Sequence, residues 1–181
     1  MRIVLDTNVL VSGLLSPFGP PGEIVRMVSS GALVLCLDAR ILAESDDVLA
    51  RPRFGFDPDS VAALLDYIDF RSEVVASEPL EQRLPDPDDE PFLEVAAACG
   101  ADCLVTGNLA HFPSHMTAGV TVLSPAQFLD GLRAQSRAGD TVSSRPKCNT
   151  RADEHDCRSC WDATPMPEAP SVTGGPSGRE G

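Results

Sequence analysis

Acidic side chains stand at several points of this chain where they could hold a divalent cation. Asp6 directly follows three apolar residues near the start, and Asp86, Asp88 and Asp89 occupy three of four successive positions. Carboxylates this close repel one another unless a cation or water screens them, and hard divalent ions prefer oxygen ligands. A cation held in this way can activate water and neutralise charge on a phosphate, so these residues point to hydrolytic chemistry.

Helix capping is the competing explanation for these aspartates. Taken alone, Asp6 is better explained as the N-cap of the next helix, and one aspartate within residues 86–89 would be enough to complement a helix N-terminus. Three carboxylates exceed that need, so we favour metal binding for this acidic loop. Acidic residues recur at later strand and helix ends, which favours the same role for Asp6.

Glu44 is a further acidic candidate, in the helix predicted after the second strand. Steps of three and four place it on one helix face with the apolar residues Ile41 and Val48. A glutamate on an inward face is costly unless something pairs with it, so this pattern predicts a partner for Glu44. A solvated helix face is the alternative, and it is the better explanation for Asp46 and Asp47.

The elements that must position these residues alternate between strands and helices. Short apolar runs predict buried parallel strands, and the segments between them carry apolar residues at helical spacing. Right-handed crossovers then give an α/β fold, with a central parallel sheet of four to five strands and helices on both faces. Residues 16–22, with three prolines and two glycines, are predicted to be a loop. Strands are predicted over residues 3–5, 33–37, 73–76, 103–106 and 120–123, and helices over 9–15, 23–30, 39–50, 57–68, 92–99 and 124–132.

One end of this sheet is expected to hold the site. In open α/β sheets, ligands bind beyond the carboxyl ends of the strands. That end would gather Asp6, Asp38, Asp89 and Asn108. Asp38 resembles the N-cap of the helix that follows it, so we leave it out of the site.

The composition divides the chain near residue 134. The net charge is -13, and residues 1–134 contain eight Arg, no Lys and 20 acidic residues. This acidity is unfavourable for binding nucleic acid through basic residues, but it suits a domain that collects divalent cations or meets a basic partner. Residues 135–181 are rich in Pro, Gly and Ser and poor in apolar residues, so we predict a disordered tail after a folded domain at 1–134.

The tail contains four side chains of the types that bind zinc. Cys157 and Cys160 have the spacing of a zinc knuckle, and Cys148 and His155 lie nearby. Few apolar residues surround them, and the distance from Cys148 to the other three fits no short zinc pattern. We therefore favour a tail that is unrelated to the folded core.

Five motifs in this order and spacing resemble the PIN-domain family of metal-dependent ribonucleases. The resemblance is strongest to the bacterial toxin components of toxin–antitoxin pairs, the VapC-like members, and it implies a three-layer α/β fold. Each motif alone is weak, but their order and spacing together are specific, and they span about residues 2–132. The matching segments are residues 4–10, 41–44 with 48–54, 86–89 with 92–96, 105–108 with 111–113, and 123–129.

The resemblance implies an acidic quartet that binds Mg²⁺ or Mn²⁺. Asp6, Glu44 and Asp89 match its first three catalytic residues, and Asp89 is chosen because it stands seven residues before Ala96. Asp6 and Asp89 would bind the main ion, while Glu44 would position or deprotonate the attacking water. The fourth member is usually the aspartate of a Thr-x-Asp turn, and Asn108 stands there. Its carbonyl can still coordinate a cation, but the lost charge should weaken a second ion more than the first.

Other residues are assigned supporting roles. Thr7, Asn8 and Thr106 are expected to be supporting polar groups of the site. Arg51, Arg53 and His111 are candidates for RNA contacts, and Arg40 is a further one. For Arg51 and Arg53, solvated positions after a helix end are an equally good explanation, and for His111 packing in its loop is the better one.

The leading hypothesis is an endoribonuclease toxin with RNA as substrate, a cognate antitoxin as partner and homodimerisation as a further option. The runner-up is a catalytically weak or inactive PIN-like module that binds RNA or protein, suggested by Asn108. A haloacid-dehalogenase-type phosphatase is discounted, because Asn8 replaces its second aspartate and residues 1–134 lack lysine. The sequence has no long apolar segment and no signal-peptide pattern, so a cytoplasmic protein without membrane association is expected.

Overall fold

The computed structural model describes residues 1–140, and the side chains of residues 1–137. The predicted disordered tail, with its four potential zinc ligands, lies outside the described residues except for the segment 135–140. That segment belongs to the last helix, which continues to Asp140 and therefore passes the predicted helix end at 132.

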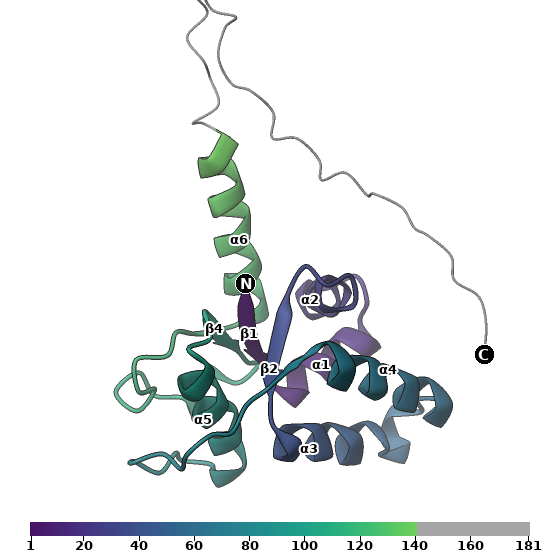
Figure 1. Ribbon diagram of the computed structural model, residues 1–181. Coiled ribbons are helices and arrows are strands. Elements are labelled where there is room, and N and C mark those ends of the chain that lie inside the picture. Colours follow the sequence, from purple (N-terminus) through teal and green to yellow (C-terminus); the bar gives the residue numbers. More distant parts are fainter. Residues whose placement is uncertain (141–181) are drawn as a thin grey trace, which may run out of the picture. The chain divides into compact units, whose positions relative to one another are not determined.

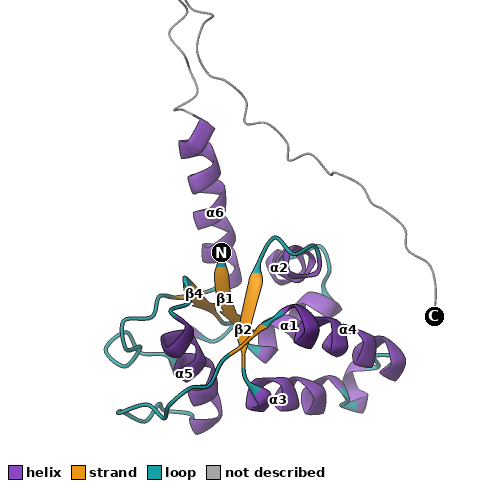
Figure 2. Cartoon of the chain, in the orientation of Figure 1, coloured by secondary structure: helices purple, strands orange, loops and turns teal. Residues whose placement is uncertain are grey.

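A five-stranded parallel sheet forms the centre of the fold (Figure 2). Its spatial order is β3-β2-β1-β4-β5, and every neighbouring pair is parallel, which confirms the predicted parallel sheet. Strand β1 is central, and its residues Ile3, Val4 and Leu5 are apolar and buried, as in strands covered on both faces. The strands are β1 (Arg2–Leu5), β2 (Val34–Leu37), β3 (Glu73–Val74), β4 (Cys103–Val105) and β5 (Val122–Leu123).

Helices cover both faces of this sheet, as the crossover pattern predicts (Figure 1). Helix α5 packs on β1, β2 and β4 on the left of the strands in Figure 1, and α1, α2 and α4 lie to their right. The α-helices are α1 (Thr7–Leu15), α2 (Pro20–Ser29), α3 (Ala39–Leu49), α4 (Pro58–Arg71), α5 (Glu90–Cys99) and α6 (Pro125–Asp140). Short 3₁₀ helices are η1 (Pro52–Phe54), η2 (Pro87–Asp89) and η3 (Leu109–His111).

The predicted loop over residues 16–22 is wrong in its second half, because α2 begins at Pro20. Proline suits the first turn of a helix, where its missing N–H would have no partner. Gly22 fits there because a Cβ at this position would lie 2.3 Å from the carbonyl oxygen of Pro17. The prolines and glycines thus mark a tight entry into a helix and not a longer loop.

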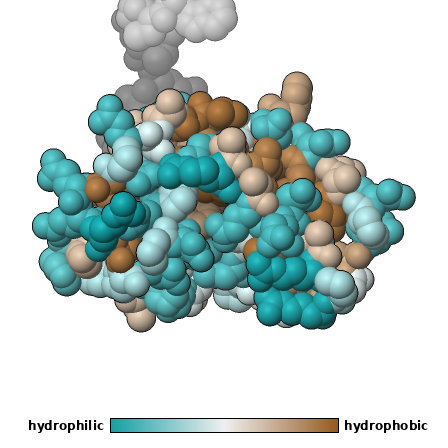
Figure 3. Space-filling view, turned by 90° about the horizontal axis from the view of Figure 1, so that it is seen from below, coloured by the Kyte–Doolittle hydropathy of each residue, from teal (hydrophilic) through white to brown (hydrophobic). Residues whose placement is uncertain are grey.

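Figure 3 shows the molecule from below the view of Figure 1. This face is mainly hydrophilic, with apolar side chains in small separate patches. Within residues 1–140, no helix is both long enough and apolar enough to cross a membrane.

Candidate functional site

Parallel pairing of β1 with β4 brings Asp6 and Thr106 together. The register pairs Leu5 with Val105, so the next residue of each strand emerges at the same edge of the sheet. Thr106 donates a 2.6 Å hydrogen bond from Oγ1 to Oδ2 of Asp6. Asp6 is only 4% exposed, and its other carboxylate oxygen accepts from the N–H of Asn8 as the N-cap of α1. Asp6 is therefore the N-cap of α1, and its second oxygen is held by Thr106 at the end of the sheet, so capping does not exclude metal binding.

Asn8 joins the two strand ends into one rigid unit. Its Nδ2 donates to Oδ2 of Asp6 at 2.6 Å, and its Oδ1 accepts from the N–H of Gly107 at 2.9 Å. A Cβ on Gly107 would lie 2.8 Å from that oxygen, so a glycine is needed for this approach. Thr106 Oγ1 also accepts from the N–H of Asn108 at 2.9 Å, which fixes the turn after β4.

Glu44 lies at the edge of the buried face of α3, which corrects the prediction that it lies on the inward stripe. The buried residues of that helix are Ile41, Ser45 and Leu49, and Glu44 is only half-buried. Ser45 Oγ lies 3.3 Å from Oγ1 of Thr7. A hydrogen bond from Thr7 to the Glu44 carboxylate partly lowers the pKa of Glu44, so Thr7 is the polar partner that the sequence pattern required.

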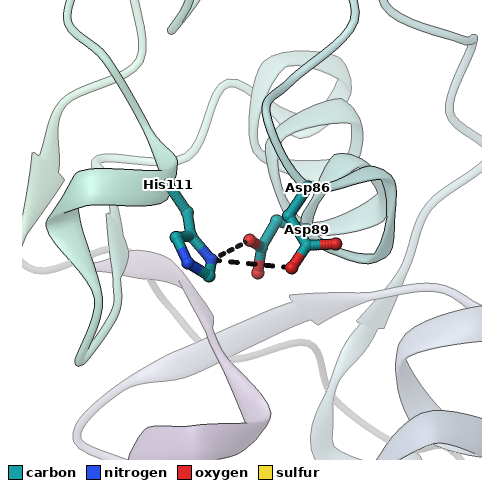
Figure 4. Close-up of side chains that lie close together, drawn as sticks. All are labelled: Asp86, Asp89 and His111. Carbon is teal, nitrogen blue, oxygen red and sulfur yellow. Dashed lines mark hydrogen bonds and ion pairs between the residues drawn. The ribbon is translucent and has the colours of Figure 1, made fainter.

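His111 joins Asp86 and Asp89 in a compact group (Figure 4). Its Nδ1 lies 2.6 Å from Oδ2 of Asp89 and 3.8 Å from Oδ2 of Asp86. One ligand atom from each of the three residues can be chosen so that all lie within 4.8 Å of one another. On the other side of the ring, Nε2 lies 2.6 Å from Nδ2 of Asn108. The preferred interpretation of His111 as a packing residue of its loop is therefore wrong.

Two buried glutamates of α5 anchor the acidic loop in front of that helix. Glu90 accepts from the N–H of Leu84 at 3.1 Å and pairs with Arg83, while Glu94 accepts from the N–H of Leu80 at 3.2 Å. The second oxygen of Glu94, a side chain only 4% exposed, lies 2.7 Å from Nη2 of Arg40. These contacts hold the chain that carries Asp86 and Asp89 against the sheet.

Arg40 also pairs with Asp38, which caps α3 through the N–H groups of Arg40 and Ile41 as predicted. Arg40 is thus held by two carboxylates. The other two arginine candidates lie near the end of α3. Arg51 pairs with the exposed Asp47 at 2.8 Å, and the guanidinium of Arg53 lies 4.5 Å from the ring centre of Phe54.

The carboxylates of Asp6, Glu44 and Asp89 act on one another electrostatically. Burial raises the pKa of each of them, and it is the largest cause in every case. The charge of Asp6 further raises the pKa of both Glu44 and Asp89. Hydrogen bonds from Thr106 and Asn8 lower the pKa of Asp6 in part, and the bond to His111 does the same for Asp89. Asp6 thus raises the pKa of both other carboxylates, and Asp89 also raises that of Glu44, so the three groups lie close enough to interact.

This set of donors fits a divalent metal ion. Its ligands would be carboxylate oxygens, which hard cations prefer, and a positive ion would favour the ionised forms that burial and the charge of Asp6 disfavour. Asn108 lies at the edge of the group through its contact with His111. Asn8 and Thr106 hydrogen-bond to Asp6, and Thr7 interacts with Glu44. The contacts of Arg51 and Arg53 described above are instead to Asp47 and Phe54.

The sequence reasoning missed three acidic residues of this region. Asp86 was set aside in favour of Asp89, although both side chains turn toward His111. Glu90 and Glu94 were not considered. The signal for Glu94 was present, because it is a charged residue between Leu93 and Val95 in an apolar helix and therefore needs a buried partner.

A comparison with protein-family models finds one match, to a model described as PIN domain, over residues 2–110. The matched region is more than half of the chain and contains Asp6, Glu44, Asp89 and Asn108, and it ends one residue before His111. No curated protein and no solved structure matches the chain.

Proposed function

The chain belongs to the PIN-domain family, a family of nucleases, and we propose that it is a divalent-metal-dependent endoribonuclease. The observation that carries this proposal is the buried carboxylate of Asp6, coupled electrostatically to Glu44 and Asp89 at the carboxyl end of the sheet. Burial raises the pKa of all three carboxylates, and the charge of Asp6 raises that of Glu44 and Asp89 further, which supports a metal-binding role over a structural one.

Each residue of the site has a role in this proposal. Asp6 and Asp89 bind the main Mg²⁺ or Mn²⁺ ion, with Asn108 at the fourth position of the family pattern. Glu44, half-buried at the edge of α3, positions or deprotonates the attacking water. Thr106 and Asn8 hold the Asp6 carboxylate in one orientation through two 2.6 Å hydrogen bonds. When bound, the ion supplies neutralisation of charge on the phosphate and a more acidic water.

The biological role that we propose is that of a VapC-like toxin with RNA as substrate and an antitoxin protein as partner. A single specific observation favours a second candidate, a PIN-like module that binds RNA or protein without cutting it. Asn108 replaces an acidic residue of the quartet, and its side chain contacts His111. Under this alternative the protein would bind RNA equally with and without Mg²⁺.

The decisive experiment replaces Asp6 by asparagine and measures RNA cleavage with Mg²⁺ or Mn²⁺. We expect Asp6→Asn to lose at least about 100-fold in rate, because metal stabilisation of the transition state is worth several kcal/mol. Its circular dichroism spectrum should match that of the wild type.

The matched control is Asp46→Asn, which removes an exposed carboxylate of α3 outside the site. This control should cleave RNA at the wild-type rate. Full activity of Asp6→Asn would refute the assignment of the metal site. A wild-type protein that never cleaves RNA with either ion would favour the binding module.

A further inference from the structure

His111 adds an imidazole nitrogen to a site whose other candidate ligands are oxygen atoms. Its Nδ1 points between Asp86 and Asp89, at 3.8 and 2.6 Å from their Oδ2 atoms. Metal–ligand bonds to histidine nitrogen and carboxylate oxygen are about 2.0–2.2 Å long, so ligand atoms on one ion lie about 3–4.4 Å apart. The distance from His111 to Asp86 lies within this range, and the contact between His111 and Asp89 must open slightly to admit an ion.

Asp86 is already oriented for such a role. Its Oδ1 accepts from the N–H of Asp88 at 3.1 Å, as the N-cap of η2. This bond fixes the carboxylate and leaves Oδ2 as the atom turned toward His111. Asp89, only 15% exposed in its side chain, supplies the most buried of the three ligand atoms.

Asn108 can orient His111 because an amide has both a donor and an acceptor. With its nitrogen donating to Nε2, the imidazole carries its proton on Nδ1 and donates it to Asp89, as the side chains are placed here. With the amide turned over, Oδ1 of Asn108 accepts from Nε2–H of His111. The lone pair of Nδ1 is then free to bind a metal ion between Asp86 and Asp89. An aspartate at 108 offers only acceptors, so the asparagine allows both states.

We propose that His111, Asp86 and Asp89 together bind a first-row transition-metal ion, with Asn108 as the residue that positions His111. The inference rests on the proposed function for the role of the ion in RNA cleavage. Binding of the ion itself can be tested without RNA. Imidazole is a ligand for Fe²⁺, Co²⁺, Ni²⁺ and Zn²⁺, whereas Mg²⁺ takes oxygen ligands and keeps its waters. Of the two ions named in the proposed function, an imidazole ligand therefore favours Mn²⁺ over Mg²⁺, and Asn108 acts through His111 instead of as a ligand.

The test uses Mn²⁺ as the probe on the full chain, because Mn²⁺ is paramagnetic and binds thiolates of the tail weakly. Pulsed electron paramagnetic resonance should detect ¹⁴N coupling from a coordinated imidazole in the wild type. His111→Ala should lose this coupling and bind Mn²⁺ about tenfold more weakly or worse, since even outer-shell partners cost 10–100-fold. Competition by Mg²⁺ should become more effective in that variant.

Three further variants locate the effect. His115→Ala and His155→Ala remove the other two histidines and should leave the nitrogen coupling unchanged. Asp86 is half-exposed and lies outside the hydrophobic core, so Asp86→Asn should fold normally. It should weaken Mn²⁺ binding while the ¹⁴N coupling remains.

The outcomes separate this inference from the proposed function. A wild type that cleaves RNA but shows no nitrogen coupling, or a coupling that persists in His111→Ala, overturns the inference and leaves the nuclease proposal standing. Loss of the coupling in His155→Ala would place the metal at the tail and also overturn it. Coupling that depends on His111 in a protein that never cleaves RNA refutes the nuclease proposal alone.

Discussion

Asp6 shows the conflict between stability and function at the level of one side chain. Its carboxylate is 4% exposed, and burial raises its pKa even though Thr106 and Asn8 donate hydrogen bonds to it. The ionised form is therefore less favourable in the folded protein than in the unfolded chain. A carboxylate of this kind is expected where a bound cation, and not the rest of the fold, stabilises its ionised form.

Asp6→Asn should accordingly raise the melting temperature in EDTA at neutral pH. Because the folded pKa of Asp6 lies above its unfolded value, its favourable contribution is complete below the unfolded pKa and is lost as the pH rises through the folded pKa. The gain in the variant should therefore be largest near pH 7 and shrink as the pH falls toward 4. Thermal unfolding over a pH series measures both effects.

Addition of Mn²⁺ should reverse this order, because only the wild type has the complete carboxylate set to bind the ion. Asp46→Asn serves as the control and should follow the wild type at every pH. A variant that is less stable than the wild type in EDTA at pH 7 would show that the hydrogen bonds from Thr106 and Asn8 outweigh the cost of burial.

At the level of elements, α5 and the loop before it depend on the pair between Glu94 and Arg40. Glu94 is 4% exposed in its side chain, whereas Arg40 is 50% exposed and reaches across from the start of α3. The pair thus connects two helices near the site. The pair gives Arg40 a structural role, and an RNA contact of Arg40 stays a prediction.

Arg40→Met should destabilise the protein by about 1–3 kcal/mol, the cost of leaving a buried acceptor without its partner. Urea unfolding monitored by circular dichroism measures this difference. The matched control is Arg51→Met, whose partner Asp47 is 73% exposed, and it should cost less than about 1 kcal/mol. Equal effects of the two substitutions would show that the buried pair has no special importance.

At the level of the whole molecule, acidic residues outnumber basic ones, and many arginines form ion pairs with carboxylates. Five of them pair with carboxylates within the described residues. Within residues 1–137, this pairing reduces the number of arginines that can contact an RNA backbone, so we expect a bound metal ion to supply part of the attraction. These five are Arg2, Arg40, Arg51, Arg83 and Arg133.

RNA binding should consequently depend weakly on monovalent salt and strongly on divalent ions. About three phosphate contacts by basic residues would give a slope of about −2 in a plot of log affinity against log salt for single strands. Fluorescence anisotropy with Glu44→Gln measures this slope at fixed Mn²⁺ without cleavage. A slope steeper than about −5 would indicate a basic RNA-binding surface instead.

Local patterns in the sequence were sufficient for the order of the strands and helices and for Asp6 and the acidic loop 86–89 as candidates, while the resemblance selected Asp89 within that loop. Apolar runs, caps and breakers act between residues near in sequence, so they predict elements reliably. They misjudged the start of α2, because the same prolines and glycines suit both a loop and a tight helix entry. The parallel sheet followed from the alternation of elements, since a helix between strands requires a crossover.

Only the tertiary structure decided which side chains meet. His111 lies 22 positions from Asp89 in sequence, and Arg40 contacts Glu94 across two helices. Glu44 is only half-buried, because the buried face of α3 is centred on Ile41, Ser45 and Leu49, and periodicity cannot resolve that face within one residue step. Contacts between distant segments depend on how crossovers and loops pack over the sheet, and no periodicity within a single element contains that information.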